Sequence, residues 1–204
     1  MKSLYVTDRT AIGDERLAAV LDRLAGAPGL AVTLREDPAV ADRDLVARAR
    51  DARARLGESV PLYVHRRYDV ALASAASGVH LPSHGLPLPR VRAAVPRGLC
   101  VGRSTHSAAE AEDAIAAGAD FVVIGPVFDT PSKRRYGAPL GPEALAGLPR
   151  RDAHTCDVFA IGGVDEDRLP ELDRYRDQIS GVAAIRLFQE SADPRGVAER
   201  IAER

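Results

Sequence analysis

The chain has 204 residues, which is enough for a substantial core, and we expect one domain over residues 1–204. Its 28 basic and 29 acidic residues leave a formal net charge of −1, so overall charge favours neither nucleic acid nor an anionic membrane as partner. No apolar run approaches the roughly 20 residues that cross a bilayer, and the amino-terminal segment turns polar too early for a signal peptide. These features predict a cytoplasmic protein.

Short apolar runs alternate with amphipathic stretches from one end of the chain to the other. The β-rich runs predict strands at residues 3–7, 30–34, 61–64, 78–81, 99–102, 121–124, 158–161 and 181–185. Apolar residues at helical spacing predict helices at residues 14–24, 42–56, 68–76, 88–95, 107–117, 142–147, 167–172 and 193–203. In the fifth of these helices, Ser107 and Glu110 form a capping-box pattern at the start, and Gly118 follows the end.

This alternation predicts the fold class. Strands that alternate with helices pair in parallel through right-handed crossovers, and eight such units close into a (β/α)8 TIM barrel. A flavodoxin-like or Rossmann sheet is the alternative, but it would need only about five or six strands and would leave segments unassigned. The long basic segment at residues 125–140 contains proline and is typical of a lid or binding loop.

Small polar and cationic residues follow the ends of several predicted strands. Ligands of parallel α/β proteins bind at the carboxyl ends of the strands, so we expect these residues to gather around a small phosphorylated ligand. They are Arg103, Ser104, Thr130, Ser132, Lys133, Gly162 and Gly163. Lys133 can place an ammonium group over the mouth of the barrel, beside the hydroxyl groups of Thr130 and Ser132.

An anion site is predicted beside the last two strands. Gly162 and Gly163 directly follow a strand and precede a helix start, so they form either a tight turn or a backbone that approaches a phosphate. Barrels commonly hold phosphate between the loops after strands seven and eight, where Arg186 would add charge. Arg35, at the end of strand two, can hold a phosphate or carboxylate with two hydrogen bonds. The alternative interpretation of Arg35 is a structural ion pair, either with Glu36 or with a residue at a neighbouring strand end.

Two of the five histidines are placed to act as acid or base near neutral pH. His65 ends strand three and His106 follows strand five, so both can face the mouth. His80 lies inside an apolar strand, and we interpret it as part of the barrel wall. Cys100 and Cys156 have no CxxC spacing and are interpreted as structural. No spacing of histidine, aspartate and glutamate predicts a metal site.

In order and spacing, eight motifs resemble the thiamine phosphate synthase/TenI superfamily over nearly the whole chain. They are TDR at 7–9, LRE at 34–36, DVAL at 69–72, GVHL at 78–81, GRSTHS at 102–107, AxxxGAD at 114–120, GPVFDTPSK at 125–133 and AIGG at 160–163. The last two together are quite specific. The resemblance implies a (β/α)8 barrel, in agreement with the count of strand and helix units.

The resemblance implies one of two reactions. Synthases of this superfamily join a pyrimidine pyrophosphate to a thiazole phosphate, and two aspartates hold the Mg²⁺ that assists departure of pyrophosphate. Their LREK, IND and GQxD patterns read LRED, VHR and PSHG here, at residues 34–37, 64–66 and 82–85. Both magnesium carboxylates are therefore replaced, and Asp37 stands where the pattern has lysine. Because leaving pyrophosphate needs its charge neutralised, these departures disfavour the synthase reaction.

The segments HLPS and GRSTHS resemble the TenI branch, whose members are thiazole tautomerases. We therefore expect an isomerase of thiamine biosynthesis that needs no cofactor and shifts a proton to aromatise a carboxythiazole phosphate. Pro126 occupies the position of the tautomerase histidine, so the proton would be carried by His106 or His65. The remaining implied roles are phosphate binding by Gly162, Gly163 and Arg186, carboxylate binding by Arg35, and positioning of the ring by Ser104 and Lys133.

Two alternatives stay open. One is a thiamine phosphate synthase, for which Mg²⁺ would be required. The other is a non-catalytic regulatory protein that keeps the phosphate pocket. In every case the expected partner is a small molecule, thiazole phosphate or thiamine phosphate, and association of copies into a homo-oligomer is left open.

Overall fold

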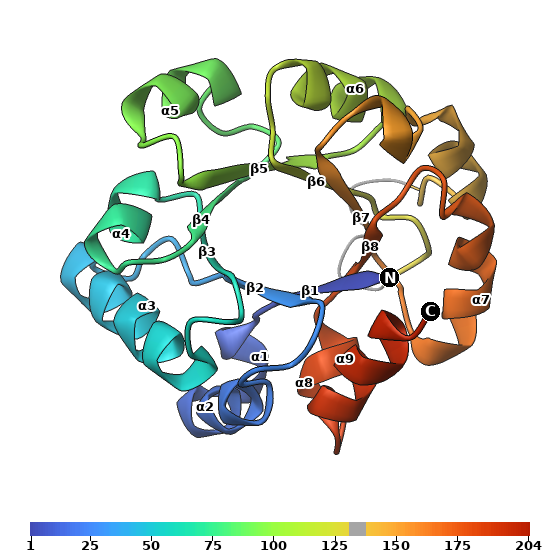
Figure 1. Cartoon of the computed structure of the whole chain (residues 1–204). Coiled ribbons are helices and arrows are strands. Elements are labelled where there is room, and N and C mark those ends of the chain that lie inside the picture. The colour runs from blue at the N-terminus through green and yellow to red at the C-terminus, as the bar shows by residue number, and fades with distance from the viewer. Residues whose placement is uncertain (131–137) are drawn as a thin grey trace.

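Eight parallel strands form a closed barrel in the computed structural model, which describes residues 1–130 and 138–204 (Figure 1). The strands are β1 (Lys2–Val6), β2 (Leu30–Leu34), β3 (Leu62–His65), β4 (Gly78–Leu81), β5 (Cys100–Thr105), β6 (Phe121–Ile124), β7 (Asp157–Ile161) and β8 (Gly181–Ala184). Each strand pairs with the next in sequence, and β1 pairs with β8 to close the ring. The predicted (β/α)8 fold is confirmed.

Helices cover the outside of the barrel. They are α1 (Arg9–Ile12), α2 (Asp14–Arg23), α3 (Asp42–Leu56), α4 (Tyr68–Ala73), α5 (Leu88–Ala94), α6 (Ala108–Ala116), α7 (Leu169–Leu172), α8 (Arg186–Gln189) and α9 (Pro194–Ala202). Between β6 and β7 the described residues form the 3-10 turns η2 (Pro142–Gly147) and η3 (Arg151–Ala153) in place of an α-helix. The sequence pattern did not predict α1 or α8. No helix among the described residues has the length and apolar character to cross a membrane.

The start of α6 confirms the predicted capping box in a shifted form. The Ser107 hydroxyl accepts a hydrogen bond from the Glu110 N–H at 3.1 Å, as the pattern requires. The Glu110 carboxylate accepts its return bond from the N–H of His106 at 2.8 Å, one residue before the cap. Gly118 follows the helix with φ of 85°, a left-handed conformation that suits glycine. These local bonds fix where the chain turns from β5 into α6.

The core has two layers, one on each face of the strands. Outside the barrel, apolar side chains such as Leu62 and Val101 are fully buried against the helices. Inside it, a smaller cluster includes Leu4, Phe121 and Phe159. Successive side chains of a strand point to opposite faces, so a strand buried on both faces is apolar throughout. The strand β6, all of whose residues are buried, has this form.

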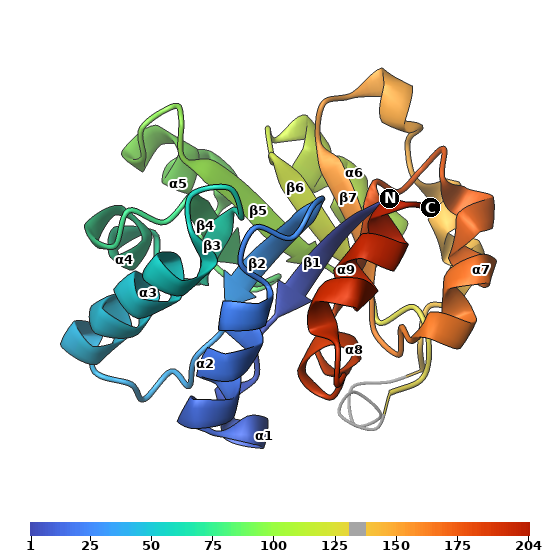
Figure 2. The same ribbon diagram turned by 60° about the horizontal axis from the view of Figure 1, so that its bottom comes forward.

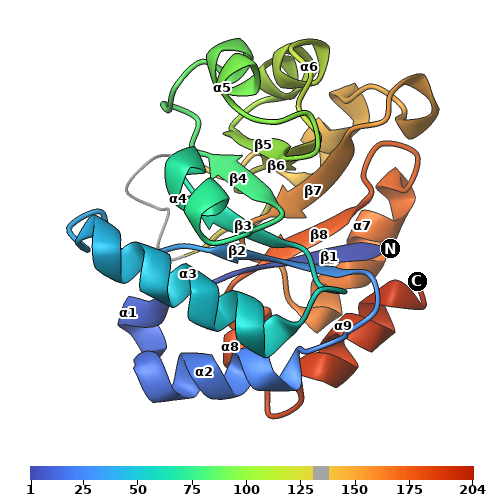
Figure 3. The ribbon, with the colours of Figure 1, turned by 60° about the vertical axis from the view of Figure 1, so that its left-hand side comes forward.

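The figures show which end of the barrel carries the loops after the strands. In Figure 2, β1 runs from the amino terminus towards α1, and α8 lies at the same end as α1. Both chain termini lie beside each other at the opposite end (Figures 1 and 2). Figure 3 shows α3 and α4 packed along the outside of β2, β3 and β4. Any ligand bound at the carboxyl ends of the strands is therefore far from the termini.

An aromatic stack fills the interior below the carboxyl ends. The Phe121 ring stacks on Tyr63 with centroids 4.4 Å apart and meets the edge of the His80 ring at 5.3 Å. Gly102, on the neighbouring strand β5, leaves room for it, because a Cβ there would lie 2.1 Å from Cζ of Phe121. The small residue and the large ring are thus a matched pair.

We expect Gly102→Ala to lower the free energy of unfolding by about 1–3 kcal/mol, the usual cost of overpacking a filled core. Chemical denaturation of the wild-type and variant chains measures this. The double variant Gly102→Ala with Phe121→Leu should recover part of the loss, since a smaller side chain makes room for the added methyl group. If the loss of unfolding free energy in the double variant equals the sum of the losses in the two single variants, the pairing of these residues is contradicted.

Candidate active site

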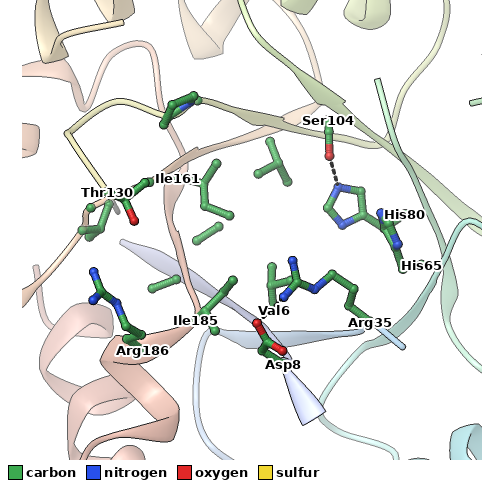
Figure 4. A pocket seen from close by; sticks show the side chains of 18 of the residues that line it. Val6, Asp8, Arg35, His65, His80, Ser104, Thr130, Ile161, Ile185 and Arg186 are labelled. Carbon is green, nitrogen blue, oxygen red and sulfur yellow. Dashed lines mark hydrogen bonds and ion pairs between the residues drawn. The ribbon is translucent and has the colours of Figure 1, made fainter. Parts of the chain in front are cut away.

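A cavity of about 480 Å³ opens at the carboxyl ends of the strands (Figure 4). Apart from Arg103, ten residues carry a predicted site role, and eight of them line this cavity. The eight are Arg35, His65, Ser104, His106, Thr130, Gly162, Gly163 and Arg186. The other two, Ser132 and Lys133, lie outside the described residues. Their gathering follows from strand polarity, because parallel strands bring all their carboxyl ends to one side.

The turn after β7 packs against the segment after β6. Gly162 and Gly163 have φ values of 101° and 66°, a region that glycine enters at little cost. A Cβ on Gly162 would lie 2.5 Å from the Cβ of Pro126, and one on Gly163 would lie 2.7 Å from the Cβ of Phe128. Side chains are therefore excluded at both positions, and the cavity wall there is bare backbone.

Backbone hydrogen bonds hold these two segments together. The N–H of Val127 donates to the carbonyl of Ile161 at 2.8 Å, and the N–H of Phe128 donates to the carbonyl of Gly162 at 2.9 Å. Among the described residues, no backbone carbonyl accepts a hydrogen bond from the N–H of Gly163. Backbone N–H groups without an internal acceptor, at a glycine turn, are typical of a phosphate site.

Arg186 lines the same cavity as this turn. It follows the end of β8, as predicted, but it begins the short helix α8, which was not predicted. Its side chain is exposed, and Figure 4 shows it on the same side of the cavity as Thr130. No ion pair of the described residues engages its guanidinium, so the full charge is available to an anion.

Arg35 reaches the cavity from β2 with part of its charge already compensated. Its Nη2 lies 2.6 Å from Oδ2 of Asp8, and its Nε donates to the carbonyl of Thr7 at 3.2 Å. The partner at a neighbouring strand end is therefore Asp8, while Glu36 pairs with Arg9. Arg35 still lines the cavity. It offers a guanidinium that a ligand anion would share with Asp8.

His80 is a buried polar group of the site that sequence reasoning did not select. Its Nδ1 lies 3.1 Å from the Thr33 hydroxyl, and its Nε2 lies 2.9 Å from the Ser104 hydroxyl. Burial, and to a lesser degree the charge of His65, lowers the pKa of His80 to about 3. The ring is therefore neutral at neutral pH, with one donor and one acceptor nitrogen. It fixes the hydroxyl of Ser104 at the cavity wall (Figure 4).

The sequence does contain a signal for this role. His80 stands between Val79 and Leu81, which both pack outside the barrel. Alternation along β4 therefore turns the histidine inwards. Its interpretation as a wall residue is consistent with its burial. What the sequence does not give is the pair of hydroxyl partners, since Thr33 and Ser104 lie 47 and 24 residues away.

The two histidines predicted to act as acid or base both line the cavity. The Nδ1 of His106 lies 2.6 Å from the carbonyl oxygen of Gly125. A carbonyl only accepts, so Nδ1 carries a proton, and Nε2 of the neutral ring is left as an acceptor. The His65 ring lies edge-on to His80, with centroids 5.6 Å apart. Their role as proton carriers stays a prediction.

Arg103 does not join the group around the cavity, contrary to expectation. The strand β5 continues to Thr105, beyond its predicted end. Alternation along the longer strand turns Ser104 inwards and Arg103 outwards. The Arg103 guanidinium donates to the carbonyls of Ser83 and Leu86, at 2.6 and 2.7 Å. It stabilises the loop after β4 and does not face the ligand cavity.

Comparison with known proteins places this site in a family. A model described as thiamine monophosphate synthase matches residues 4–188. A thiamine-phosphate synthase of Methanoculleus marisnigri is 35% identical over 202 residues, which are 98% of this chain and 94% of the relative. One of Syntrophomonas wolfei is 33% identical, with the same coverage. The solved thiamine phosphate pyrophosphorylase of Pyrococcus furiosus matches with a TM-score of 0.79 and 27% identity, over 99% of this chain and 94% of that one. This chain belongs to the thiamine monophosphate synthase family.

The expectation of a thiazole tautomerase is therefore wrong. The relatives that match this chain over nearly its whole length are described as thiamine-phosphate synthases, and the solved neighbour is a thiamine phosphate pyrophosphorylase. Pro126, where the tautomerases have their histidine, has no group that can transfer a proton. The replaced magnesium carboxylates do not exclude the synthase branch, and the HLPS and GRSTHS segments do not identify a tautomerase. Both features are instead variations within a chain whose relatives are described as synthases.

Membership of this family implies Mg²⁺, but the residues present do not fit it. Magnesium binds through carboxylates, waters and substrate phosphates. Among the described residues, no group of three or more histidine, cysteine, aspartate or glutamate side chains could hold a metal ion. The strand β3 ends in His65 followed by Arg66, and Ser83 to Gly85 after β4 carry no carboxylate.

The buried neutral ring of His80 makes stability depend on pH. The unfolded chain takes up the proton near the ordinary pKa of 6.5, whereas the folded chain takes it up only near 3. The free energy of unfolding therefore falls as the pH drops from about 6.5 towards 3. We expect His80→Gln, which cannot take up this proton, to show a shallower decline between pH 7 and pH 4.5 in denaturant unfolding. Parallel declines in the two proteins would contradict the assignment of a buried neutral histidine.

Proposed function

We propose that this chain is a thiamine-phosphate synthase, which joins a pyrimidine pyrophosphate to a thiazole phosphate. In this reaction the bond from the pyrimidine group to pyrophosphate breaks as the bond to the thiazole forms, and pyrophosphate leaves with the electron pair. The descriptions of relatives that match nearly the whole chain support the proposal. These descriptions carry the proposal, and the arrangement of charge in the cavity is compatible with two anionic substrates.

Two guanidinium groups face the cavity from different walls. Arg186 lies beside the glycine turn at β7 and β8, and Arg35 lies at β2 (Figure 4). Two phosphorylated substrates that react with each other need two anion sites in one cavity. The separation of Arg186 from Arg35 meets this requirement. A single substrate that carries a phosphate and a carboxylate would use the same two groups, so the preference for the synthase reaction rests on the descriptions of the relatives. The cavity volume of about 480 Å³ is within the usual range for small-molecule sites.

We assign the thiazole phosphate to the backbone of Gly162 and Gly163 with Arg186, and the pyrophosphate to Arg35. A guanidinium can hold a phosphate group with two parallel hydrogen bonds. Ser104 and Thr130 also line the cavity, Thr130 on the side of Arg186 and Ser104 beside His80 (Figure 4).

The remaining predicted residues complete the proposal. Ser104, whose orientation His80 fixes, and Thr130 would position the reacting rings. His65 and His106 would contact the rings from β3 and from the residue after β5. Ser132 and Lys133 lie outside the described residues, and their part in substrate binding stays a prediction.

We expect two variants to raise KM for different substrates. Arg186→Gln should raise KM for thiazole phosphate by about ten-fold or more, since it removes charge-assisted hydrogen bonds, with KM for the pyrimidine pyrophosphate nearly unchanged. Arg35→Gln should do the reverse. Release of pyrophosphate with both substrates present measures the reaction. Arg43→Gln is the control, because its side chain is 94% exposed on α3, and it should behave as wild type.

Three outcomes separate the possibilities. Product formation in which each variant raises KM for its own substrate alone supports the proposal. Binding of thiazole phosphate without any product would identify a binding protein and contradict the synthase. Product formation in which both variants affect the same substrate would keep the reaction but overturn the assignment of the two anion sites.

A further inference from the structure

The carboxylates at the mouth are too few, and too engaged, to build a cation site. Asp8 and Glu190 are the carboxylates among the described residues that line the cavity. Both oxygens of Asp8 have partners, because Oδ2 pairs with Arg35 at 2.6 Å and Oδ1 accepts from the Thr10 hydroxyl at 2.7 Å. Glu190 is exposed at the carboxyl end of α8. This leaves one carboxylate without a described partner and no second carboxylate to share an ion with it.

Positive groups and hydrogen-bond donors occupy the wall instead. Arg35 and Arg186 line it, and the glycine turn adds backbone N–H groups. At the end of β3, Arg66 adopts a left-handed backbone with φ of 72°, which is uncommon for a residue with a side chain. The N–H of Arg66 donates to the carbonyl of His80 at 2.9 Å, which ties this conformation to the barrel. This position therefore holds an arginine, which cannot be a metal ligand, and no carboxylate.

We propose that this chain binds its phosphorylated ligands without a divalent cation, and that the guanidinium groups of Arg35 and Arg186 supply the compensating charge. The proposal rests on the proposed function only in taking a pyrophosphate and a phosphate as the ligands. A guanidinium is always protonated and matches the geometry of phosphate oxygens. Two such groups can therefore compensate the negative charge of the phosphate groups, which a metal ion would otherwise compensate in part.

Asp8 then acts as an internal competitor for the anion. It holds Arg35 in place, but it also compensates part of its charge. The bond from Arg35 Nε to the carbonyl of Thr7 keeps the guanidinium positioned when Asp8 is changed. Removing the negative charge of Asp8 therefore increases the attraction of this wall for an anion.

The test is calorimetric titration of the full chain with inorganic pyrophosphate, after passage over a chelating resin and again with Mg²⁺ present. We expect binding in the metal-free protein with an affinity equal to, or tighter than, that with Mg²⁺. Magnesium complexes the free ligand and so competes with the protein. Binding that requires Mg²⁺, or that tightens about ten-fold with it (1.4 kcal/mol at 25 °C), would overturn the proposal.

Variants in the metal-free titration test whether Arg35 supplies the positive charge that binds pyrophosphate. Arg35→Gln should weaken pyrophosphate binding about ten-fold, and Arg35→Lys should recover part of the loss, because it restores the charge without the planar fork. Asp8→Asn should tighten binding about two- to five-fold. Arg43→Gln again serves as the control with unchanged affinity. Equal affinities in wild type and Arg35→Gln would show that another group meets the charge and would contradict the proposal.

The outcome is distinguishable from failure of the proposed function. Metal-free binding of pyrophosphate that weakens in Arg35→Gln and tightens in Asp8→Asn supports this inference, even if the two substrates give no product. Product formation that proceeds only with Mg²⁺, together with Mg²⁺-dependent binding, would overturn this inference and leave the synthase function standing.

Discussion

The mouth of the barrel depends on the close contact between the turn after β7 and the segment after β6. Two backbone hydrogen bonds join them, and glycine is required at 162 and 163 because any side chain would collide with Pro126 or Phe128. The contact has two consequences. It leaves bare backbone facing the cavity beside Arg186, and it carries Thr130 to the cavity wall. Phosphate binding, on this account, follows from the same close approach that closes this side of the barrel.

The cavity is lined by two arginines, Arg35 and Arg186, and two carboxylates, Asp8 and Glu190, together with the neutral ring of His80. His80 is buried and stays neutral at neutral pH, so it can orient the hydroxyls of Thr33 and Ser104 without adding charge near the ligand. Arg35 is fixed by Asp8, whereas Arg186 is free of ion pairs with the described residues. The two proposed anion sites therefore differ in how far their charge is compensated by the described residues. In the proposed synthase reaction, this difference suits two substrates that carry different phosphate groups.

The barrel could be predicted from the sequence because its evidence is local: alternating apolar runs, a capping pattern at Ser107, and glycine at 118. That most candidate residues line one cavity could be predicted too, since strand polarity alone brings them together. The rest depends on contacts between distant segments. The strand β5 continues past its predicted end, so Arg103 is a strand residue that points away from the cavity. The helix α8, which was not predicted, begins at Arg186. The tautomerase hypothesis failed because replaced carboxylates show what a site lacks, and they do not identify the reaction it performs.

The central claim is that the backbone of the glycine turn, together with Arg186, holds a phosphate group. The most direct measurement is an NMR titration of the amide groups with thiazole phosphate in metal-free protein. The account predicts that the amide resonances of Gly162, Gly163 and Arg186 shift most, with one common dissociation constant equal to that from calorimetry. Largest shifts at other loops, with these three amides unmoved, would contradict it.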